Sequence, residues 1–152
     1  MFFGVRLSVK AAVFAVIPVV FAVIPLAHSM PASAAADTPA VLKNVATGLC
    51  LESNGTGVDT SGCSNGGSRQ QWTLSSGITL KNVATGFCLE SNDSKEVHTS
   101  SCVNGSSYQK WVRGSGTTLR NLGTGFCLGS SANKGVYTDR CDDSTNQKWS
   151  GI

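Results

Sequence analysis

One short pattern occurs three times in this chain, and it constrains the possible folds more than any other feature. The stretch at residues 42–54 recurs almost unchanged at 80–92 and, in looser form, at 119–128. Each copy continues through a second cysteine to a glutamine and, two positions later, a tryptophan, and successive units are 38 or 39 residues apart. A unit that short cannot bury its own apolar side chains, so the three copies must pack against one another.

Residues 1–36 have the layout of a secretory signal peptide. Two basic residues precede an uncharged apolar run at 11–27, and sites of alternating small residues, ending at Ala34 and Ala36, follow it. A retained membrane anchor is the alternative, but the run is shorter than the roughly 20 apolar residues that a span needs. We therefore expect cleavage after Ala34 or Ala36, a secreted protein, and no membrane attachment of the mature chain.

The mature chain, residues 37–152, has almost no net charge. Without Arg6 and Lys10 of the signal peptide, ten basic residues face nine acidic ones, and the basic residues form no cluster. Because proteins that bind nucleic acid usually carry a basic patch, we do not expect a nucleic-acid partner. The length is that of one domain, which we expect to be a monomer. Its three repeats cover about residues 41–76, 77–115 and 116–152.

All six cysteines lie in the mature part of the chain, where an exported protein keeps its disulfides. Six cysteines allow 15 pairings, and the repeat favours the one with a single bridge inside each unit. These bridges are Cys50–Cys63, Cys88–Cys102 and Cys127–Cys141. Each closes a loop of about 14 residues, which stabilises the fold by about 3 kcal/mol in the chain-entropy model. Zinc sites favour cysteines separated by two to four residues, so we expect neither a metal nor another cofactor.

The repeats carry strand signals and almost no helix signal. Short segments rich in branched and apolar residues are bounded by glycine, asparagine, serine and threonine, which is typical of strands. In the first unit these segments are 41–43, 50–52, 58–60 and 71–74. Asn-Gly pairs at 65–66 and 104–105 favour tight turns. Four strands in each of three units give about twelve, which predicts an all-β fold, the β-trefoil. In this fold a closed six-stranded barrel is capped by three hairpins, and closure leaves no sheet edge unpaired.

Matching positions of the three units supply the predicted core. Each unit contributes two leucines, a valine and a tryptophan. They are Leu42, Leu51, Val58 and Trp72, then Leu80, Leu89, Val97 and Trp111, then Leu119, Leu128, Val136 and Trp149. Tryptophan rings also stack on sugars, but a large ring at the end of every unit is more typical of a barrel core with few aliphatic side chains. We therefore predict structural roles for the tryptophans and for the nearby glutamines, Gln70, Gln109 and Gln147.

The pattern of the whole unit resembles that of a known family. Paired cysteines, Cys-Leu-x near the start of each unit and Gln-x-Trp at its end, three times in register, are similar to the ricin-type β-trefoil lectins. Residues 82–92 and 104–111 of the second unit follow such a unit almost residue by residue, and the resemblance covers residues 41–149. It implies a β-trefoil fold and carbohydrate binding in a shallow pocket on each unit.

The resemblance also implies which side chains bind the sugar. The family places an aspartate two positions after the first cysteine, because a carboxylate accepts short, charge-assisted hydrogen bonds from sugar hydroxyls. This chain has Glu52, Glu90 and Gly129 there, and the longer glutamate side chain retunes or abolishes the contact. An aromatic ring covers the apolar face of the sugar and an amide adds a polar contact. The third unit keeps both, as Tyr137 and Asn146.

We therefore predict candidate ligands in three incomplete pockets. They are Glu52, Asn54 and Asp59 in the first unit, Glu90, Asn92 and His98 in the second, and Asn133, Tyr137 and Asn146 in the third. The expected partners are glycans of the mannose or galactose type, bound with altered or weak specificity. Asn54, Asn92 and Asn104 are also Asn-x-Ser/Thr sequons, which a glycosylating secretory pathway would modify.

Protein binding and catalysis are the alternatives to carbohydrate binding. A secreted β-trefoil with decayed sugar pockets could bind a protein, as an interaction module or protease inhibitor, through polar loops such as 52–57 and 91–96. An enzyme is disfavoured, because His98 is the only histidine of the mature chain and the sequence pairs it with no nucleophile. A glycosidase needs two carboxylates, and the pair Glu52 and Asp59 is not kept in the second unit.

Overall fold

The computed structural model describes residues 38–75, 79–133 and 135–151, together with residue 4. Apart from residue 4, the predicted signal peptide and both predicted cleavage sites lie outside these residues. Within the part of the chain that is described, no helix is long and apolar enough to cross a membrane.

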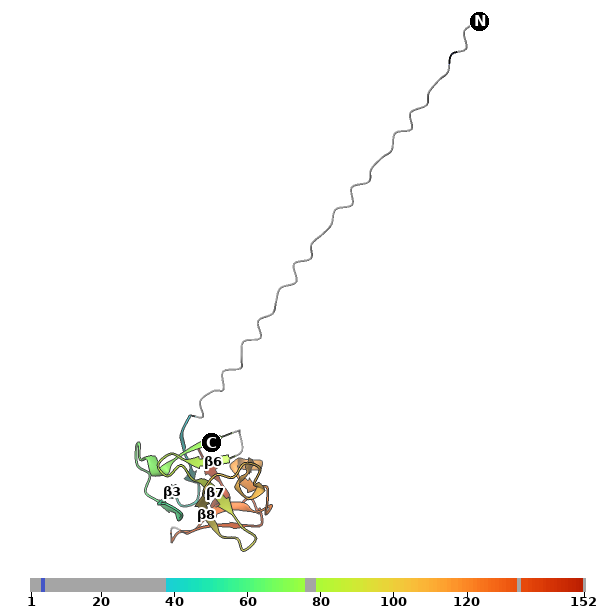
Figure 1. The fold of residues 1–152 in the computed structure, drawn as a ribbon. Coiled ribbons are helices and arrows are strands. Elements are labelled where there is room, and N and C mark those ends of the chain that lie inside the picture. The colour runs from blue at the N-terminus through green and yellow to red at the C-terminus, as the bar shows by residue number, and fades with distance from the viewer. Residues whose placement is uncertain (1–3, 5–37, 76–78, 134, 152) are drawn as a thin grey trace. The chain divides into compact units, whose positions relative to one another are not determined.

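Short antiparallel strands form almost all the regular structure (Figure 1), which confirms the all-β prediction. The described residues contain thirteen strands and four short 3-10 helices, and no α-helix. The strands are β1 (Ala40–Val41), β2 (Lys43–Asn44), β3 (Cys50–Ser53), β4 (Val58–Ser61), β5 (Gln71–Ser75), β6 (Thr79–Asn82), β7 (Cys88–Ser91), β8 (Val97–Ser100), β9 (Trp111–Arg113), β10 (Leu119–Asn121), β11 (Cys127–Ser130), β12 (Val136–Asp139) and β13 (Trp149–Ser150). The 3-10 helices are η1 (Ser68–Gln70), η2 (Ser107–Gln109), η3 (Ser115–Thr117) and η4 (Thr145–Gln147).

The three sheets join strands of neighbouring units. Their strand orders are β1-β5-β6-β7-β8, β12-β11-β10-β9 and β13-β2-β3-β4, and every pair is antiparallel. In each sheet, the strand that begins at or next to the tryptophan of one unit pairs with a strand near the start of the next unit. These pairs are β5 with β6, β9 with β10, and β13 with β2. The registers are Trp72↔Asn82, Trp111↔Asn121 and Trp149↔Asn44. Because the last register joins the third unit to the first, the arrangement is a closed β-trefoil, as predicted.

The strand expected at residues 41–43 is divided at Leu42, which is why thirteen strands are present rather than twelve. β1 pairs with β5, whereas β2 pairs with β13 and β3. The carbonyl of Leu42 accepts a hydrogen bond from the backbone N–H of Leu51 at 2.9 Å. The first strand therefore changes partner at Leu42, where it passes from one sheet to another.

A buried asparagine at the start of each unit ties that unit to the one before it. Asn44, Asn82 and Asn121 donate from Nδ2 to the backbone carbonyls of Asn146, Arg69 and Tyr108, each at 2.7 Å. Their Oδ1 atoms accept from the backbone N–H groups two and three positions later, as in an Asx turn. A glycine with φ between 69° and 75° follows in each turn. These bonds explain the Asn-x-x-Thr-Gly segment of the repeat.

Leucines and tryptophans form the buried core of the described residues. They are Leu42, Leu51, Trp72, Leu80, Leu89, Trp111, Leu119, Leu128 and Trp149. Each tryptophan Nε1 donates to the carbonyl of the second leucine of its unit at 2.9–3.0 Å, and no tryptophan is more than 1% exposed. The structural role of the tryptophans is confirmed, because buried rings cannot stack on a sugar. The three valines predicted for the core, Val58, Val97 and Val136, are only partly buried against it.

The disulfides are the three predicted ones, one inside each unit. Cys50–Cys63, Cys88–Cys102 and Cys127–Cys141 each have a Cα–Cα distance of 5.0 Å, and the described residues contain no free cysteine. Each bridge connects the first residue of β3, β7 or β11 to the loop that precedes the 3-10 helix of the same unit. It therefore holds the hairpin of that unit closed.

Three pairs of buried hydroxyl groups join the units to one another. Ser53 Oγ lies 3.2 Å from Thr99 Oγ1, Ser91 Oγ lies 2.8 Å from Thr138 Oγ1, and Ser130 Oγ lies 3.1 Å from Thr60 Oγ1. The pairs connect the first unit to the second, the second to the third, and the third to the first. We call these six residues the hydroxyl ring. In the described residues no buried side-chain nitrogen or oxygen lacks a partner, so the ring adds polar groups to the interior without leaving them unsatisfied.

Thr138→Val is expected to lower the free energy of unfolding by about 1–3 kcal/mol, because it removes the partner of the buried Ser91 hydroxyl. The double variant S91A/T138V removes both polar groups and should lose less. Thr73→Val, on β5 and outside the hydroxyl ring, serves as the control and should change stability by less than about 0.5 kcal/mol. Urea denaturation measures all three. Equal losses in T138V and T73V would contradict the role of the ring.

Candidate functional site

The glutamine of each Gln-x-Trp segment holds the backbone of the loop before it. Its Oε1 accepts from a backbone N–H, at 2.8 Å from Ser64 and from Val103 and at 3.1 Å from Asp142. Its Nε2 donates to a backbone carbonyl in every unit, at 2.9–3.0 Å. Gln70, Gln109 and Gln147 are all buried. The predicted structural role of the glutamines is therefore confirmed.

In the first unit the same glutamine also binds the candidate carboxylate. Gln70 Nε2 donates to Glu52 Oε2 at 3.0 Å, and Ser61 Oγ donates to the same oxygen at 2.5 Å. The hydrogen bond from Ser61, followed by that from Gln70 and the charge of Arg69, holds the pKa of Glu52 below its ordinary value, although burial opposes them. Asp59 is the cross-strand neighbour of Glu52. This pocket therefore presents two acidic side chains, with an aspartate where the family pattern has a ring.

The second unit repeats this arrangement with a histidine in place of the aspartate. Gln109 Nε2 and Ser100 Oγ donate to Glu90 Oε2 at 2.7 and 2.6 Å. Burial raises the pKa of Glu90, but these two hydrogen bonds and the charge of His98 together lower it more. His98 is the cross-strand neighbour of Glu90, and its Nε2 lies 3.8 Å from Glu90 Oε1. The structure therefore brings these two candidate ligands together.

In the third unit a tyrosine ring takes the place of the carboxylate. Tyr137 is the cross-strand neighbour of Gly129, and a Cβ atom at Gly129 would lie only 2.7 Å from Cζ of the ring. Burial raises the pKa of Tyr137, as do the negative charges of Asp142 and Asp139, and the polar contact with the Asn146 side chain lowers it by less. This pocket therefore combines a neutral phenol with an amide, and any larger residue at Gly129 would displace the ring.

The asparagines predicted as ligands lie in the loops that follow β3, β7 and β11. Asn92 binds Glu96 twice, since its Nδ2 donates to Glu96 Oε2 at 2.8 Å and its Oδ1 accepts from the backbone N–H of Glu96 at 3.1 Å. Asn133 Oδ1 accepts a hydrogen bond from Ser131 Oγ, and Asn54 is exposed. Asn92 and Asn133 therefore shape their own loops. The ligand role of all three asparagines stays a prediction.

Tyr108 was not among the predicted ligands, yet it occupies the position that Asn146 has in the third unit. It is 37% exposed, and its hydroxyl donates to Asp93 Oδ2 at 3.2 Å. That hydrogen bond, together with the charge of Asp93, raises the pKa of Tyr108. The sequence signal for it is the tyrosine directly before Gln-x-Trp in residues 104–111, which belongs to the segment that matches the family pattern.

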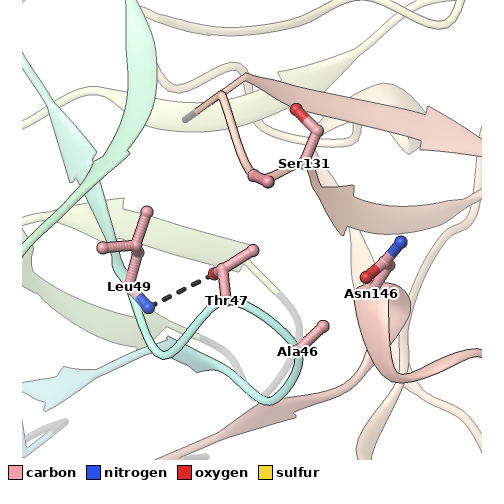
Figure 2. Close-up of a pocket in the computed structure, with 6 residues that line it drawn as sticks. Ala46, Thr47, Leu49, Ser131 and Asn146 are labelled. Atoms are coloured by element: carbon pink, nitrogen blue, oxygen red, sulfur yellow. Dashed lines mark hydrogen bonds between the residues drawn. The ribbon is translucent and has the colours of Figure 1, made fainter.

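An open groove lies between the third unit and the first. Its volume is about 620 Å³, and it is lined by Ala46, Thr47, Leu49, Ser131, Ala132 and Asn146. Figure 2 shows the Ala46, Thr47 and Leu49 side chains on one side, and Ser131 and Asn146 on the other. We call this the 3–1 groove. No sequence pattern predicts this groove, because its two walls come from opposite ends of the mature chain.

The closed three-unit fold, the three intra-unit disulfides and the buried Gln-x-Trp segments define a β-trefoil of the Gln-x-Trp class. Residues 38–149 match the family model described as ricin-type beta-trefoil lectin domain. The chain therefore belongs to the ricin-type β-trefoil lectin family, which confirms the resemblance seen in the sequence.

Solved structures with the same fold include natural and designed proteins. The C-half of an earthworm R-type lectin, in complex with GalNAc, has a TM-score of 0.64 and 16% identity, covering 74% of this chain and 96% of that one. A non-toxic homologue of type II RIPs from bitter gourd, in complex with α-methyl-D-galactoside, has a TM-score of 0.66 and 24% identity over 75% and 47% of the two chains. ThreeFoil, a designed 3-fold symmetric protein, has a TM-score of 0.63 and 25% identity, and the match covers 75% of this chain and 97% of that one. No curated protein sequence matches this chain.

Glu90→Gln is expected to flatten the acid side of the pH–stability profile. Because the pKa of Glu90 is lowered in the folded state, its stabilising contribution is present above the unfolded pKa of about 4.3 and is lost as the pH falls through the folded value. Urea denaturation between about pH 5 and pH 3 should therefore show a shallower loss of stability in the variant. Thr73→Val, which leaves every carboxylate in place, is the control and should follow the wild type. Parallel profiles for E90Q and the wild type would contradict the assignment.

Proposed function

We propose that this chain is a secreted lectin that binds glycans through the pockets of its three units. The observation that carries the proposal is the fixed carboxylate of Glu52 and of Glu90, where Oε2 is held by a glutamine and a serine and Oε1 takes no part in those bonds. Membership of a lectin family supports it. So do the two similar structures that were solved with GalNAc and with α-methyl-D-galactoside. Secretion is proposed from the signal peptide predicted at residues 1–36.

The first two pockets would recognise a sugar through Oε1 of the glutamate, the carboxylate oxygen that the glutamine and the serine do not bind. Hydrogen bonds from sugar hydroxyls to a carboxylate are about twice as strong as those between neutral groups. Because the other oxygen is already fixed, little side-chain entropy remains to be lost on binding. His98 adds a ring and a nitrogen donor or acceptor beside Glu90, whereas Asp59 adds a second negative charge beside Glu52. We therefore expect a neutral sugar to bind the second pocket more tightly than the first.

The third pocket would recognise a sugar without any carboxylate at the family position. The ring of Tyr137 offers an apolar face for the sugar, and the Asn146 amide offers both a donor and an acceptor. Neutral hydrogen bonds are weaker than charge-assisted ones, so we expect this pocket to be the least sensitive to pH and salt. Three weak pockets on one rigid body would raise avidity only for a target that is itself multivalent.

Galactose-type and mannose-type glycans are the proposed targets. The galactoside-bound and GalNAc-bound relatives favour the first class. Residues 82–92 and 104–111 resemble the units of actinohivin, a mannose-binding lectin, and favour the second. The pockets of this chain differ from one another, so different units could prefer different sugars.

We propose a binding function without catalysis. The lowered pKa values of Glu52 and Glu90 suit a hydrogen-bond acceptor, whereas a general acid near neutral pH needs a raised one. A domain of this fold also occurs within an enzyme. In the structure of GalNAc-T7 with UDP, GalNAc and Mn2+, the likeness has a TM-score of 0.64 and 20% identity and covers 22% of that chain. An attached domain of that kind is not required for sugar binding by the pockets described above.

Glu90→Gln tests the lectin proposal, because the amide keeps the shape of the side chain and removes its charge. We expect a glycan array of galactose-type and mannose-type sugars to identify a ligand. Calorimetry should then show the second pocket weakened at least about tenfold in E90Q, since a hydrogen bond to a charged group contributes about 1.5–3 kcal/mol. Thr73→Val, on a strand without candidate ligands, should bind as the wild type does.

A folded protein that binds no sugar of either class would overturn the lectin proposal. Capture of one protein from the culture medium, unaffected by competing sugars, would instead support the alternative of a protein-interaction module or protease inhibitor.

Secretion is tested by expressing the full chain and sequencing the protein recovered from the medium. We expect the mature N-terminus at residue 35 or 37, because cleavage follows Ala34 or Ala36. Replacing Ala34 and Ala36 with bulky residues such as leucine should keep the precursor uncleaved, since signal peptidase sites require small residues. A wild-type protein that stays in the cell with residues 1–36 attached would contradict the proposal.

A further inference from the structure

We propose that the 3–1 groove receives the second sugar of a neutral oligosaccharide whose first sugar lies against Tyr137 and Asn146. The third unit would then select oligosaccharides over monosaccharides. The inference rests on the proposed lectin function and adds to it a substrate class for one pocket. Asn146 carries the connection, because it lines the groove and lies close enough to the Tyr137 hydroxyl to affect its pKa.

The groove has the size and the lining that such an occupant needs. A volume of about 620 Å³ falls within the range of roughly 300–1,000 Å³ that is usual for ligand pockets. Leu49 and two alanines offer apolar contact, and Ser131 and Asn146 offer polar contact. The Ser131 hydroxyl donates to Asn133 Oδ1, which leaves its oxygen able to accept from a sugar hydroxyl. Of the residues that the structure describes, no acidic or basic side chain lines the groove, so a neutral sugar fits it better than a charged one.

The two walls of the groove are held in a fixed relation by a single side chain. Asn44 Nδ2 donates to the carbonyl of Asn146 at 2.7 Å, on one side of the groove. Asn44 Oδ1 accepts from the backbone N–H groups of Ala46 at 3.2 Å and of Thr47 at 3.1 Å, on the other. Asn44 is fully buried. The groove is therefore formed before a ligand arrives, which reduces the ordering cost of binding.

The equivalent corner between the second and third units is occupied by side chains. Tyr108 stands at the position of Asn146 and Asp93 at the position of Ala132, and the two are hydrogen-bonded at 3.2 Å. A Cβ atom at Gly123, the counterpart of Ala46, would lie 2.8 Å from Cδ1 of Tyr108, so the ring lies directly against that turn. At the corner between the first and second units, Arg69 stands at the position of Asn146 and brings a positive charge. Among the described residues, the small and uncharged lining is thus specific to the 3–1 groove.

Two matched tryptophan substitutions test the proposal. Ala46 and Ala84 are exposed and occupy the same position of the Asx turn in the first and second units, where each backbone N–H donates to the asparagine Oδ1. Ala46→Trp fills the 3–1 groove, whereas Ala84→Trp places the same ring at the corner between the first and second units. Both variants should keep the wild-type melting temperature within a few degrees, because neither position is in the core.

The probes are methyl α-D-galactoside and methyl α-D-mannoside, and disaccharides that end in the same residues. For the preferred sugar we expect the wild type to bind the disaccharide at least about tenfold more tightly than the monosaccharide, the equivalent of about 1.4 kcal/mol. Ala46→Trp should abolish this preference, so that the two sugars bind about equally tightly, and Ala84→Trp should leave it intact. In NMR titrations, only the disaccharide should shift the backbone amide signals of Ala46, Thr47 and Leu49.

The outcomes separate this inference from the lectin proposal. Sugar binding without a disaccharide preference, or a preference that Ala46→Trp and Ala84→Trp reduce equally, overturns the groove assignment and leaves the lectin proposal standing. A folded protein that binds none of the four probes and no glycan on the array overturns both.

Discussion

The buried asparagine at the start of each unit is the contact on which the rest of the structure depends. Asn44, Asn82 and Asn121 each lie opposite a core tryptophan in the sheet, and each carries hydrogen bonds in two directions. The Nδ2 bond reaches the preceding unit, and the Oδ1 bonds shape the turn of the asparagine's own unit. One side chain therefore sets the distance between neighbouring units. Because the same turn forms a wall of the 3–1 groove, it also fixes a surface that a ligand can reach.

The Gln-x-Trp glutamine connects this framework to the candidate pockets. In every unit its Oε1 accepts a hydrogen bond from the backbone and its Nε2 donates one to the backbone. In the first two units Nε2 also donates to a carboxylate. In the third unit Gln147 keeps the backbone bonds, and the tyrosine ring lies where the carboxylate would be. The framework thus tolerates either a glutamate or a glycine at the ligand position. A pocket can change its chemistry while the glutamine continues to hold the fold.

The fold could be predicted from the sequence because its determinants recur at a fixed spacing. The leucines, the tryptophans and the cysteine pairs appear in all three units, and the structure buries or bridges them as expected. The candidate site could be predicted only in part, because the residues that hydrogen-bond its ligands do not recur in all three units. Ser61 and Ser100 bind the two glutamates, but the third unit has Asp139 at that position. The hydroxyl ring and the 3–1 groove depend on contacts between units, and a linear pattern does not show which residues of different units meet.

The pairing of β13 with β2 has a consequence for the order of the units. The third unit meets the first through the same register, the same asparagine bond and the same hydroxyl pair that join units adjacent in sequence. The polypeptide is linear, but its network of contacts is cyclic. A circularly permuted chain that began with the second or the third unit would contain the same set of inter-unit bonds. Since no unit is topologically first, the position of a unit along the chain does not decide which contacts it makes with its neighbours.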